Sequence, residues 1–238
     1  MWQLQICYDG KEHITTKKTV TWKLQHIIRK LQNALNAFEQ GRLKQAEILY
    51  LECLDKIQDK DTPAYKQALH GLSYVKIEMK QLTEANELYS ELLRISQNEG
   101  NKEDEAIALH QLGIVHRMDR NYEAARRYLE QEETIYKSIQ GNFHLGLAAN
   151  YYEQGMIDFL MNNFQKAKVF MKKSLGEAKQ DADQMVIGYT YRALGDIESK
   201  RGDVKEAIRY FEYATSAFEK VDANEAVKEI RDKIVKLK

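Results

Sequence analysis

Apolar residues recur along this chain with the spacing of amphipathic helices. In the segment GDVKEAIRYFEYATSAFEK, residues 202–220, Ala207 and Ala214 lie one heptad apart, with Tyr210 and Phe211 between them. Residues three and four positions apart share one face of an α-helix. The segment therefore predicts a helix with one apolar side built from small and large residues.

The same pattern occurs four more times. Aligned on Ala207, the equivalent residues follow one another at intervals of 39, 40, 42 and 40 residues: Ala46, Ala85, Ala125, Ala167 and Ala207. Twelve positions earlier the chain always carries a small residue: Ala34, Ser73, Gly113, Gly155 and Gly195. A period in this range is typical of helical repeat arrays. Small residues in both helices of a pair let the two backbones approach closely, so each repeat is predicted to be a helix hairpin that crosses there.

The pattern and its polar interruptions predict ten helices, over residues 22–40, 43–59, 62–79, 82–98, 102–119, 122–139, 143–161, 164–180, 183–201 and 204–220. Pro63 suits the first turn of a helix, where its missing N–H costs no hydrogen bond. Asn121, Asn163 and Asp203 precede second helices and are predicted to cap their first N–H groups.

The two ends of the chain differ from the repeats. Residues 222–237 place apolar side chains on one face and charges elsewhere, which predicts a C-terminal capping helix. Residues 1–21 alternate apolar residues around Asp9 and Gly10, which predicts an N-terminal arm or short hairpin.

These features together resemble the tetratricopeptide repeat (TPR). The segment YRALGDIESKRGDVKEAIRYFEYA, residues 191–214, is the best copy, with signature residues at Tyr191, Leu194, Gly195, Gly202, Ala207, Phe211 and Ala214. The period is longer than the usual 34 residues and resembles that of kinesin light chains and of bacterial peptide-pheromone receptors. HEAT repeats share the period but do not explain the alanine column.

The resemblance implies an all-α fold, a right-handed α-solenoid of five TPR-like hairpins plus a capping helix over residues 22–238. Some positions depart from the family pattern: no repeat has the terminal proline, and Glu132 stands where a small residue belongs. The pair Glu132 and Glu133 is interpreted as solvated helix surface.

Composition limits the classes of partner. Lys and Arg together number 36, as do Asp and Glu, so the chain has no overall basic field for nucleic acid or an anionic membrane. No long apolar run and no signal-like N-terminus occur, which predicts a cytoplasmic protein without membrane insertion. Cys7 and Cys53 cannot form a disulfide framework, and Cys53 is predicted to be a buried thiol.

No catalytic signature is present, so we expect neither an enzyme nor a bound cofactor. The sequence contains no glycine-rich phosphate loop, no HExxH and no GxSxG. His70 and His110 occupy equivalent positions in adjacent repeats, but no third metal ligand is evident, so no metal site is predicted.

The TPR resemblance implies a concave groove lined by the first helix of each hairpin. Carried over position by position, the residues expected to bind a peptide or partner protein are His70, Tyr74, His110, Gln111, Arg117, Tyr152, Glu153, Arg192 and Asp196. Their mixture of aromatic rings, His, Gln and Arg suits recognition of a peptide backbone or carboxylate. His110, Gln111, Arg117 and Arg192 are expected to be accessible, since a polar group on that face need not be buried, whereas Tyr74 could belong to the core or the groove.

The sequence therefore predicts a protein-interaction module acting as an adaptor or scaffold. One alternative is a peptide-responsive regulatory sensor similar to the pheromone receptors of Gram-positive bacteria, although residues 1–21 are too few for the N-terminal domain of those receptors. A phosphatase-like enzyme is a remote alternative. Recognition of chaperone tails is not expected, because the clamp positions of that TPR subclass hold Leu31, Leu35, His70 and Tyr74. The partner and the oligomeric state are left open.

Overall fold

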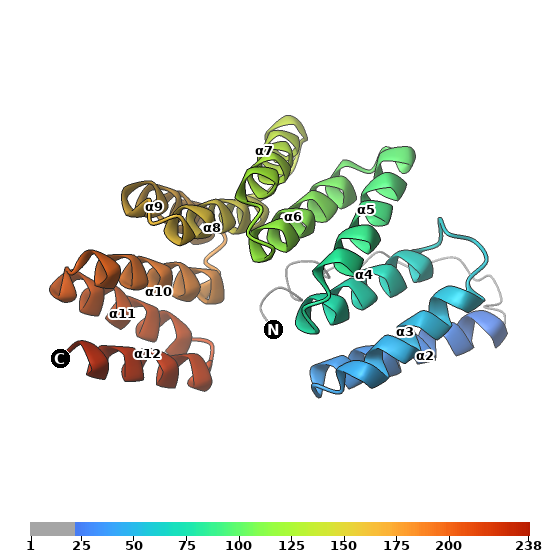
Figure 1. Ribbon diagram of the computed structural model, residues 1–238, viewed down its shortest axis with the longest axis horizontal. Helices are drawn as coiled ribbons and strands as arrows, with labels where there is room; N and C mark the ends of the chain where they lie inside the picture. Colours follow the sequence, from blue (N-terminus) through green and yellow to red (C-terminus); the bar gives the residue numbers. More distant parts are fainter. Residues whose placement is uncertain (1–21) are drawn as a thin grey trace. The chain divides into compact units, whose positions relative to one another are not determined.

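The structure is a computed structural model, and it describes residues 22–238 as a series of α-helices (Figure 1). In chain order the helices are α2 (Trp22–Glu39), α3 (Leu43–Lys56), α4 (Pro63–Glu78), α5 (Leu82–Glu99), α6 (Lys102–Met118), α7 (Tyr122–Ser138), α8 (His144–Leu160), α9 (Phe164–Gln180), α10 (Gln184–Arg201), α11 (Val204–Glu219) and α12 (Asn224–Leu237).

The all-α fold and the helix positions are confirmed. Every predicted helix is present, and each end lies within three residues of its predicted place. Within residues 22–128, α2 packs with α3 and α4 with α5, and α3 packs on α4. Within residues 129–238, α8 packs with α9 and α10 with α11, and α9 packs on α10. This sequential packing is that of a helical solenoid. The predicted arm or hairpin over residues 1–21 lies outside the described residues.

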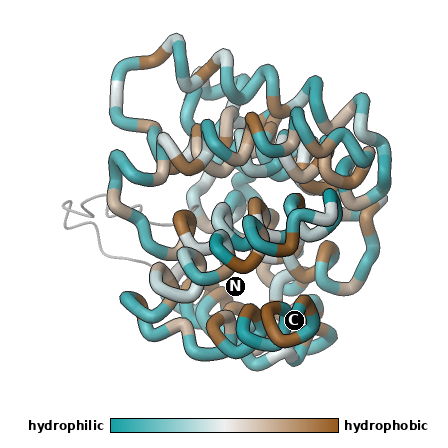
Figure 2. The backbone as a smooth tube through the Cα atoms, turned by 90° about the vertical axis from the view of Figure 1, so that its left-hand side faces the viewer, coloured by the Kyte–Doolittle hydropathy of each residue, from teal (hydrophilic) through white to brown (hydrophobic). Residues whose placement is uncertain are grey.

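The helices divide into two compact units, with the division inside α7. Of the described residues, one unit contains 22–128 and the other 129–238. In the first unit Tyr89 and Leu112 belong to the buried core, and in the second Phe211 and Phe218 do. Hydrophobic and hydrophilic residues alternate along the helices (Figure 2). Helix α11 buries one face, whereas helix α8 is buried over most of its surface between residues 148 and 158.

The alanine column marks the crossing of each hairpin, as predicted. Ala46, Ala85, Ala125, Ala167 and Ala207 are all 0% exposed. A Cβ placed on Gly155 would come within 3.3 Å of the Ala167 carbonyl oxygen, and one on Gly195 within 2.5 Å of Phe211 Cδ1. A larger residue at either glycine would therefore have to displace its neighbours, which shows that these two hairpins are closely packed at the glycines.

Each hairpin turn contains one residue in the left-handed region, five positions before its alanine. The φ values are 71° at Gly41, 61° at Lys80, 62° at Arg120, 60° at Asn162 and 82° at Gly202. In each turn the next residue's N–H donates to a carbonyl five residues back, as Gln81 does to Lys76 at 2.9 Å. This is the Schellman ending that favours glycine, and three repeats adopt it without one.

The predicted caps are confirmed at two of three helix starts. The side chains of Asn121 and Asp203 accept hydrogen bonds from backbone N–H groups of α7 and α11 at 3.2 and 3.0 Å. Thr62, which was not predicted as a cap, accepts one from the Tyr65 N–H of α4 at 3.3 Å. The prediction for Asn163 was wrong, because its side chain makes no capping bond and its amide instead donates to Asp158 Oδ1 at 3.3 Å.

Buried ion pairs join successive hairpins at equivalent positions. Lys76 of α4 lies 2.5 Å from Glu47 of α3, one residue after the first repeat's alanine. Lys168 of α9, one residue after Ala167, lies 2.5 Å from Glu198 of α10. In this second pair the lysine belongs to the second helix of a hairpin and the glutamate to the first helix of the next, the reverse of the first pair. Both contacts tie the second helix of one hairpin to the first helix of the next.

Candidate functional site

In residues 129–238, polar side chains from the first helices α8 and α10 meet those of α12 in one row. Arg192 Nη1 of α10 donates to Glu229 Oε2 of α12 at 3.3 Å, and its guanidinium lies 4.9 Å from the centre of the Tyr189 ring. Burial by itself would lower the pKa of Arg192. Tyr152 of α8 and the carboxylates of Glu229 and Asp196 have the opposite and larger effect, so the pKa of Arg192 is raised. The guanidinium is therefore held as a fixed positive centre between three helices.

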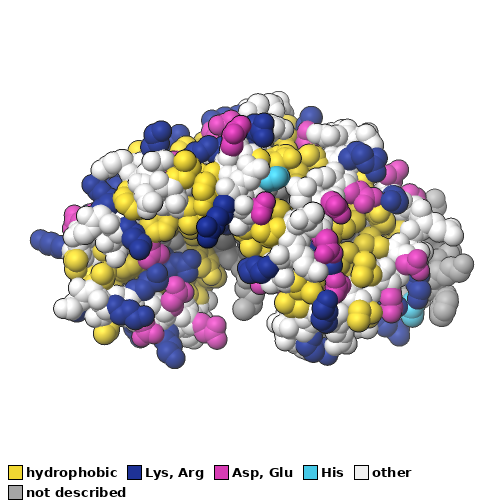
Figure 3. Space-filling model, viewed as in Figure 1, with side chains coloured by type: hydrophobic (Ala, Val, Ile, Leu, Met, Phe, Trp, Pro, Cys, Tyr) yellow, Lys and Arg dark blue, Asp and Glu magenta, His cyan; other side chains and the backbone are white. Residues whose placement is uncertain are grey.

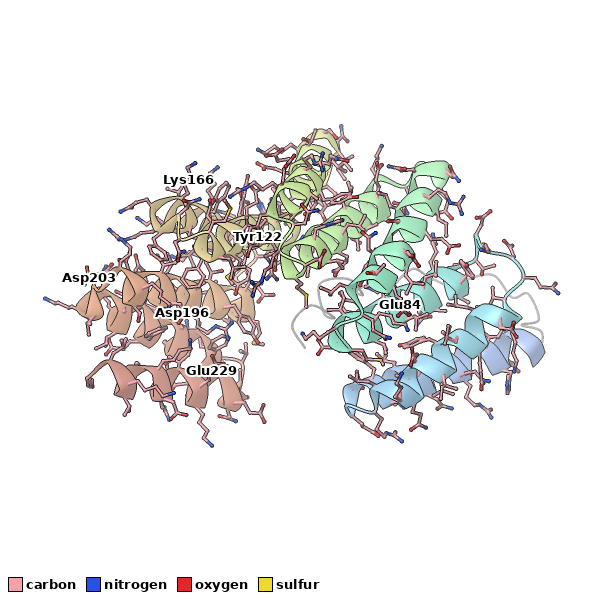
Figure 4. All side chains as sticks on the ribbon, viewed as in Figure 1. Glu84, Tyr122, Lys166, Asp196, Asp203 and Glu229 are labelled. Atoms are coloured by element: carbon pink, nitrogen blue, oxygen red, sulfur yellow. The ribbon has the colours of Figure 1, made fainter. Side chains whose placement is uncertain are left out.

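A second pair lies one helical turn further along the same helices. Lys233 Nζ of α12 donates to Asp196 Oδ1 of α10 at 2.7 Å, and Figure 4 labels Asp196 on α10 and Glu229 on neighbouring α12. We call Tyr152, Arg192, Asp196, Glu229 and Lys233 the polar row.

The polar row is only partly covered. The exposed fractions of the side chains are 25% for Arg192, 50% for Glu229, 31% for Asp196 and 33% for Lys233. Charged groups in this situation contribute little to stability when paired with each other, so a ligand can compete for them.

Tyr152, Arg192 and Asp196 were predicted as groove residues, whereas Glu229 and Lys233 were not predicted. Each follows its partner by 37 residues, close to the repeat period. An alignment of the capping helix α12 with the first helices of the five repeats could have predicted Glu229 and Lys233.

In residues 22–128, three predicted site residues lie together inside the unit. Gln111 Nε2 of α6 donates to the Tyr74 hydroxyl of α4 at 3.1 Å, and the two residues are 1% and 3% exposed. The His70 ring packs edge-on against Tyr74 and Tyr89 at 4.8 and 5.8 Å. Burial lowers the pKa of His70 to about 4, so its ring is neutral near pH 7.

The expectation that Gln111 is accessible was wrong. Its carboxamide donates to the Tyr74 phenol, and a hydrogen-bonded amide can be buried at modest cost. Tyr74 belongs to the core rather than to an open groove.

The remaining predicted site residues are distributed between the two units. His110 and Arg117 on α6 and Tyr152 on α8 are partly buried, whereas Glu153 on α8 is 5% exposed.

The interpretation of Glu132 and Glu133 as solvated surface was wrong. Glu132 is 1% exposed, and Asn150 Nδ2 of α8 donates to its Oε2 at 2.8 Å and to the Leu129 carbonyl oxygen at 2.7 Å. Glu133 accepts a hydrogen bond from the Tyr151 hydroxyl at 2.9 Å. A carboxylate replaces the family's small residue here because the next helix supplies an amide to bind it.

Other chemistry is limited over the described residues. Among residues 22–238, no three His, Cys, Asp or Glu side chains gather in a way that could hold a metal ion. None of the helices in this part of the chain is long and apolar enough to cross a bilayer. Cys53 is buried, as predicted, and burial raises its pKa to about 11.

The repeats match a known family. Residues 65–138 and 104–180 each match the sequence model of the tetratricopeptide repeat. A comparison with curated proteins finds no match to this chain.

Solved structures share the fold at low sequence identity. A Rap protein complexed with Competence and Sporulation Factor aligns with a TM-score of 0.76 at 15% identity, covering 90% of this chain and 59% of that one. BtubC (BKLC) from P. vanneervenii gives 0.64 at 17%, covering 86% and 93%. The TPR-like repeats of a putative kinesin light chain from Podosopora anserina give 0.64 at 16%, covering 83% and 97%. At such identities the likeness concerns the fold.

Proposed function

Because this chain belongs to the tetratricopeptide repeat family, we propose that it binds a peptide or partner protein through the first-helix face of its repeats, as an adaptor or scaffold. Proteins of this family are generally non-catalytic interaction modules. The proposal for this chain rests on the polar row, which offers donors and acceptors of both signs on adjacent helices.

The polar row suits recognition of an extended chain. Arg192 and Lys233 can bind carboxylates or backbone carbonyl groups, and Asp196 and Glu229 can accept backbone N–H bonds. These side chains are held in place by one another, so a ligand meets groups whose positions are already fixed.

The test is affinity capture with the full chain, comparing the unchanged protein with Arg192→Ala and Asp196→Ala. Partners retained by the unchanged protein are identified by mass spectrometry and then titrated in purified form. We expect either substitution to weaken binding by about tenfold, since each removes a charge-assisted hydrogen bond.

A matched control distinguishes a loss of ligand contacts from a loss of the contacts that hold α12 in place. Arg231 of α12 pairs with Glu219 of α11 at 2.9 Å, outside the polar row. Arg231→Ala therefore removes an ion pair of α12 without touching the row and should leave the affinity unchanged. Equal affinity in all three variants and the unchanged protein would refute the assignment.

A peptide-responsive regulatory sensor is the second candidate, and the Rap likeness favours it. That Rap protein is complexed with Competence and Sporulation Factor, and its repeats cover 90% of this chain. A sensor should compact when its peptide binds, whereas a passive adaptor should not. Small-angle scattering with and without candidate peptides distinguishes the two.

We further propose that the protein works in the cytoplasm and has no enzymatic activity. A screen for hydrolase and phosphatase turnover tests the second proposal. Turnover that is lost on substitution of Arg192 would overturn it.

A further inference from the structure

An open surface pocket in residues 129–238 is lined by the end of α9, the first half of α10 and the second half of α11. Its volume is about 350 Å³, and its lining includes Lys179 of α9, Tyr191 of α10, and Tyr213 and Lys220 of α11. This volume is in the range of sites that hold a small ligand or a side chain. We call these four residues the α9–α11 pocket.

The lining of the pocket includes two tyrosine rings and two exposed lysines. The Tyr191 and Tyr213 rings lie 5.2 Å apart, and Lys179 Nζ lies 5.7 Å from the centre of the Tyr191 ring. Beyond the pocket, Tyr210 stacks on Tyr191 at 6.2 Å and lies 5.9 Å from Lys168 Nζ. The ring contacts hold the two tyrosines in place, while the two lysines remain exposed.

The acidic residues Glu177, Asp181 and Glu219 are near the pocket in sequence, but each contacts another residue and none belongs to the lining. Glu177 lies 2.7 Å from His144, Asp181 accepts from Asn142 at 3.1 Å, and Glu219 lies 2.9 Å from Arg231. Helix α9 carries five lysines against the single acid Glu177. Among the described residues that line the pocket there are two lysines and no acid.

We propose that the α9–α11 pocket docks an acidic segment of a partner protein. The carboxylates of that segment lie against Lys179 and Lys220, and one of its side chains enters the pocket over Tyr191 and Tyr213. This surface is separate from the polar row, so the two can be tested independently.

A protein segment fits the charges better than nucleic acid does. Residues 129–238 contain 17 basic and 18 acidic residues, and both signs are interspersed on the face shown in Figure 3. A long polyanion would contact both basic and acidic residues of this surface, whereas a short acidic segment would contact mainly the lysines at the pocket.

The test uses the full chain and a short fluorescein-labelled peptide of glutamate and aspartate with one central phenylalanine. A peptide in which glutamine and asparagine replace the acids is the matched probe. Fluorescence anisotropy should show binding of the acidic peptide alone, and the affinity should fall as salt is added. Charge reversal by Lys179→Glu with Lys220→Glu should weaken binding by about tenfold or more.

Lys228→Glu with Lys236→Glu is the control, because these exposed lysines of α12 lie outside the pocket and change the net charge equally. This control and Arg192→Ala should leave the affinity within about twofold. Far-UV circular dichroism verifies that each variant is folded. Tyr213→Ala removes one aromatic ring of the pocket without changing the charge of the protein.

Equal weakening by the pocket and control pairs would overturn the proposal, as would absence of binding to the acidic peptide. A labelled single-stranded oligonucleotide that binds through Lys179 and Lys220 more tightly than the peptide would also overturn it. Loss of binding on Arg192→Ala alone would refute the separation of the two surfaces.

Discussion

Replacing Lys76 by methionine tests whether a buried ion pair holds the first two hairpins in register. Lys76 Nζ lies 2.5 Å from Glu47 Oε1, and the side chains are 7% and 12% exposed. Lys76 also pairs with Glu84 of α5, which Figure 4 labels on that helix. The substitution keeps the length and apolar stem of the side chain and removes its charge.

The magnitude follows from two opposing terms. At 2.5 Å and an effective dielectric constant of about 20, the attraction of the two charges is roughly 7 kcal/mol. Removing the charges from water costs several kcal/mol for each ion. We therefore expect a net coupling between Glu47 and Lys76 of about 1–2 kcal/mol in the free energy of unfolding.

The assay is a double-mutant cycle of Glu47→Gln and Lys76→Met in the full chain. Urea unfolding followed by circular dichroism gives the free energy of unfolding of each variant. If the repeats unfold in steps, hydrogen exchange of the α4 amides gives the free energy of local unfolding. Lys44→Gln is the control, because this lysine also contacts Glu47 but its side chain is 75% exposed. Its effect should stay below about 0.5 kcal/mol.

The pH dependence supplies an independent readout. Hydrogen bonds from Lys76 and Lys44 lower the pKa of Glu47 below its ordinary value. A carboxyl group of this kind stabilises the fold above its unfolded pKa, and the stabilisation is lost as the pH falls through the folded pKa. The coupling should therefore shrink below about pH 4. Additive effects of the two substitutions at neutral pH would refute the reasoning.

Four further substitutions test other features of the fold. Lys80→Gly should raise the free energy of unfolding by about 0.5–1 kcal/mol, because Lys80 has a φ of 61° that glycine adopts more readily; a loss of stability would contradict this. Gly195→Ala should cost about 1–3 kcal/mol, since its Cβ would lie 2.5 Å from a Phe211 ring atom. Gly176→Ala in α9 meets nothing within 4 Å and should stabilise by about 0.5–1 kcal/mol in the same denaturation assay. His70→Phe should flatten the pH dependence of stability, because a His pKa lowered to about 4 makes the native fold lose stability as pH falls from about 6.5 toward 4; unchanged slopes over that range would exclude a buried neutral ring.

The sequence by itself determined the helices and the hairpin crossings. Both depend on patterns that repeat at fixed offsets, three and four residues within a helix and about 40 between repeats. Ala167 and Gly155 could be assigned to one crossing because only small residues fit where two backbones nearly touch. The approximate ends of the helices followed from polar turns and from Pro63.

The site was predicted less completely. Tyr152, Arg192 and Asp196 do lie close together, because the family pattern places them on equivalent faces of first helices. Gln111 was expected at an accessible surface, yet it is buried and bound to Tyr74. The chain shows no local mark of that hydrogen bond, since its two residues are 37 positions apart.

Only the tertiary structure decided which polar groups are buried and which turns are strained. Glu132 lies inside because Asn150 from the next helix donates to it, and Arg192 is held because α12 places Glu229 beside it. Lys80 and Arg120 take a positive φ because the packing of both helices fixes the turn between them, whatever residue stands there. Periodic burial can be read from neighbouring residues, but the partner of a polar group comes from another helix and is known only when the helices are packed.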